Sequence, residues 1–369
     1  MRNFPAVVAA AMVMFAQTIV AQDLGGVHEP GIFDGPSYSP YAGRNFPNTP
    51  LWGDTHLHTT LSFDAGAFGN RLGPEEAYRF ARGEEITSTG GYEVRLSRPL
   101  DFLVVADHSD NMGLFTMIFE SDPSILADSE GRRIHDMIQA GGQTAVAASV
   151  ELIDTFSRGE EISDALSVEP GSRSFTSTWE RIVSAAEDYN DPGNFTAFIG
   201  YEWTSLVNTG DNLHRVVIYR DGADMALRHE PYTTMPPFGS PDPMDLWEWM
   251  EGVESASGGD VLALAHNGNM SNGIMFPVDR QYTGRRIDDD YVNARAKWEP
   301  LYEVTQIKGD GETHPYLSAD DEFADYETWA KGNLNLSVLK DDDMLQFEYA
   351  RAALRIGLAI EKKLGTNPY

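Results

Sequence analysis

Short apolar runs that stop at polar residues most constrain what this chain can fold into. Four of them are FLVVA before Asp107, AFIGY before Glu202, RVVIY after His214 and VLALA before His266. Runs of Val, Ile, Leu, Ala and Phe without strict alternation are typical of strands buried on both faces, as in a parallel sheet covered by helices. The sequence therefore predicts an α/β fold with a large core.

Between these runs lie segments with the pattern of helices. Residues 73–85 have a proline in a first turn followed by acidic residues, and residues 341–365 begin with aspartates and end with lysines and a glycine. Residues 111–192 are mostly helix and loop, so we expect a helical insertion there that caps a site. Residues 22–50 are rich in Gly, Pro, Asn and Ser and predict an extended lead-in.

The first residues have the pattern of an export signal. Arg2 is followed by an apolar run from Ala6 to Ala16 and by small residues up to Ala21. We expect residues 1–21 to be a signal peptide, because the run is shorter than the roughly 20 residues of a spanning helix. An uncleaved membrane anchor is the alternative. The prediction places the protein in the periplasm or outside the cell, detached from the membrane after cleavage.

Composition narrows the partners of the chain. The chain has no cysteine, which excludes lipid attachment through cysteine, and its formal net charge is -30. Such an acidic surface repels phosphate backbones and anionic lipids. Nucleic acids and membranes are therefore not expected partners. We expect a small-molecule substrate, and the sequence leaves the oligomeric state open.

Histidines and carboxylates gather where the apolar runs stop. In parallel α/β folds the carboxyl ends of the strands meet at one edge, where functional residues collect. Imidazoles and carboxylates are ligands that Zn, Mn and Fe prefer, and alternating residues of a strand point to one side. Seven candidate metal ligands have this placement: His56, His58, Asp64, His108, Glu202, His214 and His266. The placement is missing for four other histidines: His28, His135, His229 and His314.

A site of this kind predicts hydrolysis. Several carboxylates can hold two or three divalent ions close together, which deprotonates a bridging water and polarises the oxygen of a scissile ester. Asp64 and Glu202 are the candidate catalytic carboxylates. Arg215, directly after His214, is either a cation that pairs with a substrate phosphate or a surface residue of a strand.

Five motifs follow one another along the chain: GDTHLHTTLSFDA, DFLVVADHSD, IGYEWTS, NLHRVVIYR and LALAHNGN. Together they resemble the PHP (polymerase and histidinol phosphatase) superfamily, in particular its secreted bacterial branch catalogued as a domain of unknown function. The resemblance covers residues 51–369. It implies a distorted (β/α)7 TIM-like barrel, up to three metal ions and hydrolysis of phosphoesters.

The resemblance also implies roles for the seven candidate ligands. They are, in order, the opening H-x-H at His56 and His58, the next ligand at Asp64, the second-motif histidine at His108 beside Asp107, the bridging glutamate at Glu202, and two later histidines at His214 and His266. The closing Asp-x-His pair of the superfamily is missing before Tyr369. We therefore expect a fragment with an incomplete barrel; a truncated variant is the alternative.

Two other functions stay open. An amidohydrolase-type barrel also opens with H-x-H, but it more typically offers a lysine at a mid-barrel strand end, which this sequence does not show. A non-catalytic secreted binding protein could keep the skeleton of the metal site. Its sugar or other ring ligand would stack on tryptophans: Trp203, Trp247, Trp249 and Trp298.

Overall fold

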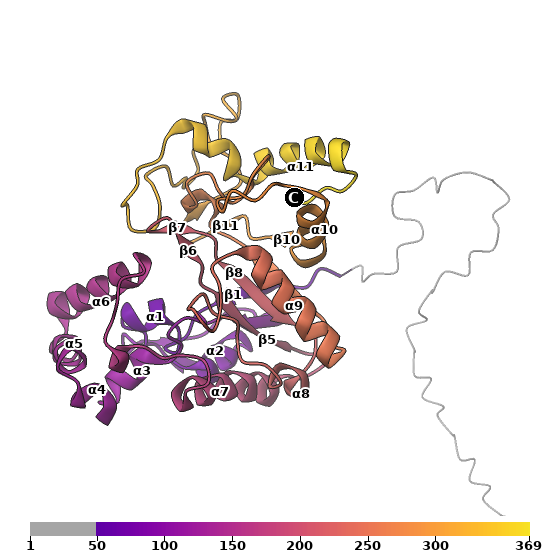
Figure 1. Ribbon diagram of the computed structural model, residues 1–369. Coiled ribbons are helices and arrows are strands. Elements are labelled where there is room, and N and C mark those ends of the chain that lie inside the picture. Colours follow the sequence, from indigo (N-terminus) through magenta and orange to yellow (C-terminus); the bar gives the residue numbers. More distant parts are fainter. Residues whose placement is uncertain (1–48) are drawn as a thin grey trace, which may run out of the picture. The chain divides into compact units, whose positions relative to one another are not determined.

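A six-stranded sheet organises the part of the chain that the computed structural model describes, residues 49–369 (Figure 1). The strands lie in the order β1 (Gly53–Leu57), β4 (Phe102–Val105), β5 (Thr196–Trp203), β8 (Arg215–Tyr219), β9 (Val261–Ala265) and β10 (Leu301–Tyr302). The predicted apolar runs supply four of these strands, so the α/β class is confirmed. The predicted signal peptide and nearly all of the lead-in lie outside the described residues.

The sheet is mixed rather than parallel. β1, β4 and β5 run parallel, and so do β9 and β10, but β8 is antiparallel to both β5 and β9. The expectation of a parallel sheet is therefore wrong for β8. The reason is the short connection from Trp203 to Arg215, which holds only the small hairpin of β6 (Leu206–Val207) and β7 (Asp211–Asn212). A parallel crossover normally needs a dozen or more residues, usually with a helix.

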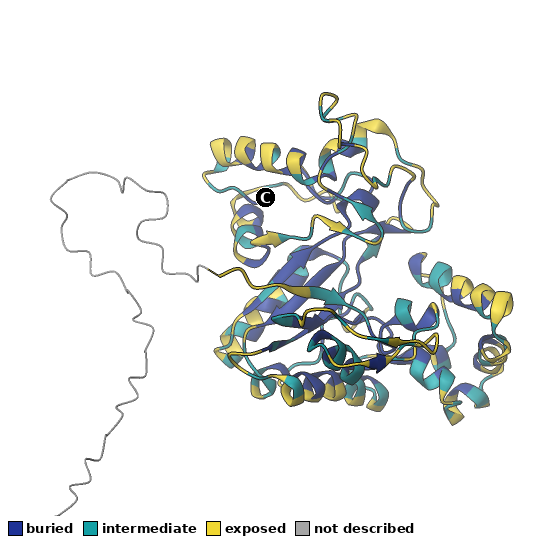
Figure 2. Cartoon of the chain, turned by 180° about the vertical axis from the view of Figure 1, so that it is seen from behind, coloured by how far each residue is buried: buried dark blue, intermediate teal, exposed yellow. Residues whose placement is uncertain are grey.

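The two faces of the sheet bury different residues. Odd-numbered side chains such as Leu103, Ile199 and Val217 belong to the main core, with helices packed on the strands: α2 (Pro74–Ala81), α7 (Arg173–Tyr189), α9 (Pro243–Ser257) and α10 (Asp289–Trp298). Even-numbered side chains form a separate small cluster on the opposite face: Val104, Ala106, Val216, Ile218 and Leu264. Figure 2 shows the strands as one of the most buried parts of the fold.

The sheet is curled, and the expected seven-stranded barrel is not confirmed. β1 and β10 are the two ends of the strand order and do not pair with each other. Nevertheless, His56 of β1 and Glu303 directly after β10 approach within 2.7 Å through Nδ1 and Oε2. The described residues therefore form a curled, open six-stranded sheet whose two edges meet at their carboxyl ends.

Residues 111–192 contain a series of helices, as the sequence predicts. They are α3 (Leu114–Phe119), α4 (Pro123–Ala127), α5 (Ser129–Ala140), α6 (Gly142–Ser157), the 3-10 turn η1 (Asp164–Leu166) and α7. The segment lies between β4 and β5. No helix within residues 49–369 combines the length and the apolar character that crossing a bilayer requires.

The predicted helix over residues 341–365 is broken in two. A 3-10 turn, η3 (Asp342–Phe347), precedes α11 (Ala350–Leu364), and Glu348 and Tyr349 between them are fully buried. Glu348 lies 2.5 Å from the ammonium group of Lys340 and accepts a hydrogen bond from the Gly273 amide at 2.9 Å. Burying this ion pair turns Glu348 out of the helical path.

The remaining elements are short and connect these layers. They are α1 (Phe63–Ala67), β2 (Ile86–Thr87), β3 (Glu93–Val94), α8 (Ala223–Ala226), η2 (Gly268–Met270), β11 (Thr305–Gln306) and β12 (Gly309–Asp310). The predicted helix over residues 73–85 is confirmed as α2, with Pro74 as its first residue.

The curl leaves no room for a side chain at Gly200 in β5. A Cβ there would lie 2.5 Å from a methyl carbon of Val104 and 2.8 Å from the carbonyl oxygen of Val217. We expect Gly200→Ala to lower the free energy of unfolding by about 1–3 kcal/mol, because overpacking forces the strands apart. Gly252 in α9 has open space around it, so Gly252→Ala should be neutral or stabilise by about 0.5–1 kcal/mol. Urea denaturation of both variants measures this, and equal effects would refute the role of Gly200.

Candidate metal centre

The face of the sheet with the even-numbered side chains, here called the inner face, also bears predicted ligands, and these lie at one edge of the sheet. On β4, β5 and β9 the inward positions continue as Val104, Phe198 and Leu264 and end at His108, Glu202 and His266. β8 runs the opposite way, so its first residues lie at the same edge, and His214 just before it joins the group. The candidate ligand of antiparallel β8 therefore lies at the start of the strand, whereas those of its neighbours lie at the ends of their strands.

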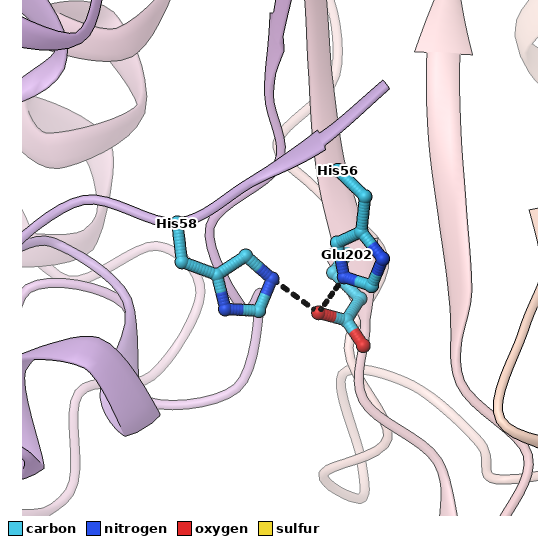
Figure 3. A group of neighbouring side chains, drawn as sticks. All are labelled: His56, His58 and Glu202. Carbon is cyan, nitrogen blue, oxygen red and sulfur yellow. Dashed lines mark hydrogen bonds and ion pairs between the residues drawn. The ribbon is translucent and has the colours of Figure 1, made fainter. Parts of the chain in front are cut away.

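Glu202 is the centre of the group and is fully buried. Its Oε2 lies 3.0 Å from His56 Nε2 and 2.7 Å from His58 Nε2, and Figure 3 shows both rings turned toward this one oxygen. His108 Nε2 lies 3.2 Å from the same oxygen. The other oxygen, Oε1, lies 2.6 Å from His214 Nδ1 and 2.8 Å from His266 Nε2. One carboxylate therefore contacts all five predicted histidines.

Asp64 completes the predicted set from a different element. It belongs to α1, which follows β1 directly, and its Oδ1 lies 2.8 Å from His58 Nδ1. Its Oδ2 lies 3.7 Å from His108 Nε2. Ser62 Oγ and the Ala65 amide donate hydrogen bonds to Asp64 at 2.7 and 2.6 Å, which fixes the orientation of the carboxylate. The structure thus brings all seven predicted ligands together.

Glu303 is a member of the site that the sequence reasoning missed. Its Oε2 lies 2.7 Å from His56 Nδ1, and together with His56 and His266 it forms a group with metal-ligand spacing. Glu303 comes directly after β10, as His266 comes directly after β9. The signal was weak, because β10 has only two residues and gives no recognisable apolar run.

Asp107 positions the site and does not belong to the groups with metal-ligand spacing among the described residues. It is fully buried and accepts hydrogen bonds from the amide and the hydroxyl of Thr59 at 2.5 and 2.7 Å. Burial raises the pKa of Asp107 to about 6. These bonds hold the chain immediately after His58 against the end of β4.

The charges of the site shift its pKa values in opposite directions. Burial alone would raise the pKa of Glu202, but the surrounding imidazoles, His108 and His56 foremost, hold it well below its usual range. Burial disfavours a charged His58, yet Asp64 and Glu202 outweigh it and raise the His58 pKa well above its usual value. For His214 and His266 burial prevails and lowers the pKa to about 3 and about 4. The metal-free site thus pairs ionised carboxylates with protonated and neutral imidazoles.

The residues present fit divalent metal ions. Within residues 49–369, three buried ring nitrogens have neither a hydrogen-bond partner nor a carboxylate within ion-pair distance: Nδ1 of His108, Nε2 of His214 and Nδ1 of His266. Buried polar atoms without a partner are costly, and coordination of an ion would satisfy them. Residues 49–369 contain four overlapping groups of three candidate ligands, and in each group the three ligand atoms lie within 4.8 Å of one another. The donor set of imidazoles and carboxylates without sulfur suits Zn, Mn or Fe.

The part of the chain that matches a known family has nearly the same bounds as the described fold, residues 49–369. Residues 45–369 match the family described as a protein of unknown function (DUF3604). The chain belongs to DUF3604. The match contains every ligand of the metal centre, from His56 to Glu303. No curated protein matches this DUF3604 chain.

Two predictions about residues near the site are wrong in this DUF3604 member. Arg215 is neither exposed nor aimed at a ligand: it is buried and donates from Nε to Glu299 at 2.8 Å. The tryptophans proposed to stack a ring are packing residues instead. Trp203, Trp247 and Trp298 are at most 3% exposed, and half-buried Trp249 stacks on Tyr232. For such large aromatic side chains, burying the apolar surface is more favourable than leaving it exposed to solvent.

Metal binding should strengthen with pH. Because the pKa of His58 is raised, its imidazole is protonated near neutral pH and must lose this proton before it can bind an ion. If one proton is released on binding, the apparent affinity for the metal rises about tenfold per pH unit at pH values below the raised pKa of His58. Competition with a chromophoric chelator between about pH 6 and pH 8 measures this slope. An affinity independent of pH over that range would contradict the assignment of His58 as a ligand.

Glu303 should contribute to metal affinity. We expect Glu303→Gln, which removes the charge and keeps the size, to weaken metal binding by about tenfold or more. Elemental analysis after dialysis against a weak chelator measures the retained metal. Glu361→Gln on α11 removes an exposed carboxylate outside the site and is the matched control. Equal retention by the two variants would exclude Glu303 from the centre.

Proposed function

We propose that this DUF3604 chain is an exported metal-dependent hydrolase of phosphate esters, with a multinuclear site and a kinship to the PHP superfamily. The observation that carries the proposal is the buried carboxylate of Glu202 in contact with five imidazoles. A protein rarely buries so many ionisable groups for packing alone, because each costs desolvation. Such clusters are typical of sites that do chemistry.

The ligands of this site divide into overlapping sets. Glu202 belongs to two of the groups with metal-ligand spacing and could bridge ions, while Asp64 and Glu303 flank it from α1 and from the end of β10. Bound divalent ions would lower the pKa of a coordinated water and polarise a phosphoryl oxygen. Asp64 and Glu202, the candidate catalytic carboxylates, would act in this proposal as ligands that hold the ions. Asp107 keeps the segment after His58 in position.

The charge of the site favours an anionic ester over an amide. Asp64, Glu202 and Glu303 contribute three negative charges, so two divalent ions bound with neutral imidazoles leave an excess positive charge. Lys308, in the turn between β11 and β12, lines the cavities on both sides of Asp64 and adds another positive charge. An excess of positive charge attracts phosphate, whereas a neutral amide gains nothing from it.

The wider setting of the proposal comes from the sequence. Residues 1–21 have the pattern of a signal peptide, which supports a periplasmic or secreted location. The five motifs of the chain support a sheet of PHP type that forms part of a TIM-like barrel. A small-molecule substrate suits the cavity of about 540 Å³ beside His56, His58 and Asp64.

Metal-dependent hydrolysis of phosphoesters tests the proposal. We expect the full chain, loaded with Zn, Mn or Fe, to hydrolyse phosphate esters, and His58→Ala to lower kcat by at least about 100-fold, because a ligand is lost. His229→Ala removes a half-buried histidine that belongs to none of the groups with metal-ligand spacing within residues 49–369 and is the control. A metal-loaded chain that turns over amides and no phosphoester, or His58→Ala with wild-type activity, would overturn the proposal.

A further inference from the structure

We propose that the substrate of this site is a phosphoester of an apolar alcohol, whose alcohol part binds in a pocket beneath α6. The proposal rests on the proposed function and narrows it to a substrate class. It is carried by a second cavity of the site, of about 320 Å³, which no part of the metal centre requires.

The walls of this pocket are mostly apolar and come from four parts of the chain. α1 and its flank, α6, β6 and the segment before η3 provide them: Phe63, Phe68, Val150, Ile153, Phe156, Leu206 and Leu334. The metal centre contributes the polar side of the same pocket through Asp64, His108 and His214. An apolar ligand in this pocket would therefore contact the metal ligands directly. Pockets of this kind, apolar with a few convergent polar groups, are typical of small-molecule sites.

The packing of α6 supports a ligand on this side. One side of the helix buries Ala148, Ser149 and Leu152 in the fold. The residues at helical spacing on another side, Val150 and Ile153, line the pocket, and Val150 remains 52% exposed. About half of the Val150 side chain is covered in the free protein, and the rest is exposed beside a concave apolar wall. Val150 gains contact area when an apolar group enters the pocket.

The position of the phosphoryl group follows from the two cavities together. The pocket under α6 and the polar cavity beside β1 share two residues, Asp64 and Lys308. Lys308 is half-buried and lines both cavities beside Asp64, so its positive charge is available to a ligand at their junction. A phosphoryl group at this junction would face the metal ligands and Lys308. The alcohol would then extend under α6, and the polar cavity would leave room for water.

Binding of two phosphonates to the metal-loaded full chain tests the inference. Phenylphosphonate and methylphosphonate share the anionic group and differ in the apolar part, and neither is hydrolysed. We expect phenylphosphonate to bind at least about tenfold more tightly in titration calorimetry, because the pocket buries its ring. Equal affinities for the two phosphonates would overturn the inference and leave the proposed function standing. Binding of neither phosphonate would overturn both.

Variants of α6 test whether the preference for phenylphosphonate over methylphosphonate comes from the pocket. We expect Ile153→Trp, which fills the space, to abolish the tenfold preference while methylphosphonate still binds. Ile153→Asp, which puts a negative charge into the wall, should abolish the preference as well and weaken the binding of both phosphonates by repulsion. Val146→Asp is the matched control, because Val146 is 52% exposed on the same helix and does not line the pocket. Thermal unfolding checks that each variant folds. A preference that survives both Ile153 substitutions in folded protein would contradict the inference.

Discussion

The contact of the Glu202 carboxylate with five imidazoles is the interaction on which the rest of the fold depends. A buried carboxylate without compensation costs several kcal/mol, so Glu202 must be surrounded by groups that carry or accept positive charge. Those groups come from β1, β4, β8 and β9, and from the residues beside them. Four strands must therefore present the same face and the same edge to one point, and the curl of the sheet achieves this.

The curl has its own requirements in the sequence. Gly200 lies two residues before Glu202 on the inward face, where a larger residue would meet Val104 of the next strand. The inward side chains next to it are the aliphatics Val104 and Ile218 and one aromatic, Phe198, while the other aromatics of β5, Tyr201 and Trp203, point into the helical side of the sheet. Along each strand, inward side chains that lead to the metal centre thus alternate with side chains that pack against the helices.

Two helices, α1 after β1 and α6 between β4 and β5, extend the site beyond its candidate metal ligands. α1 and α6 stand over the edge where Asp64, His108 and His214 meet, and they form the apolar wall of one cavity while the polar cavity lies on the side of β1. A rigid sheet that holds ions and variable helices that shape the pocket is a common division of labour in α/β proteins. In this chain the two parts share Asp64, which is both a candidate ligand and a wall residue of both cavities.

The sequence by itself determined four strands of the sheet, most helices and the seven candidate ligands, because buried strands and their polar ends leave a local pattern. It could not determine the direction of β8, the break at Glu348 or the burial of Arg215, since each depends on an ion pair or a pairing between distant segments. Glu303 stayed hidden for the same reason: β10 is too short to leave a pattern, and only its contact with His56 reveals it. Local periodicity records which side chains are buried, whereas their partners are decided only when the chain has folded.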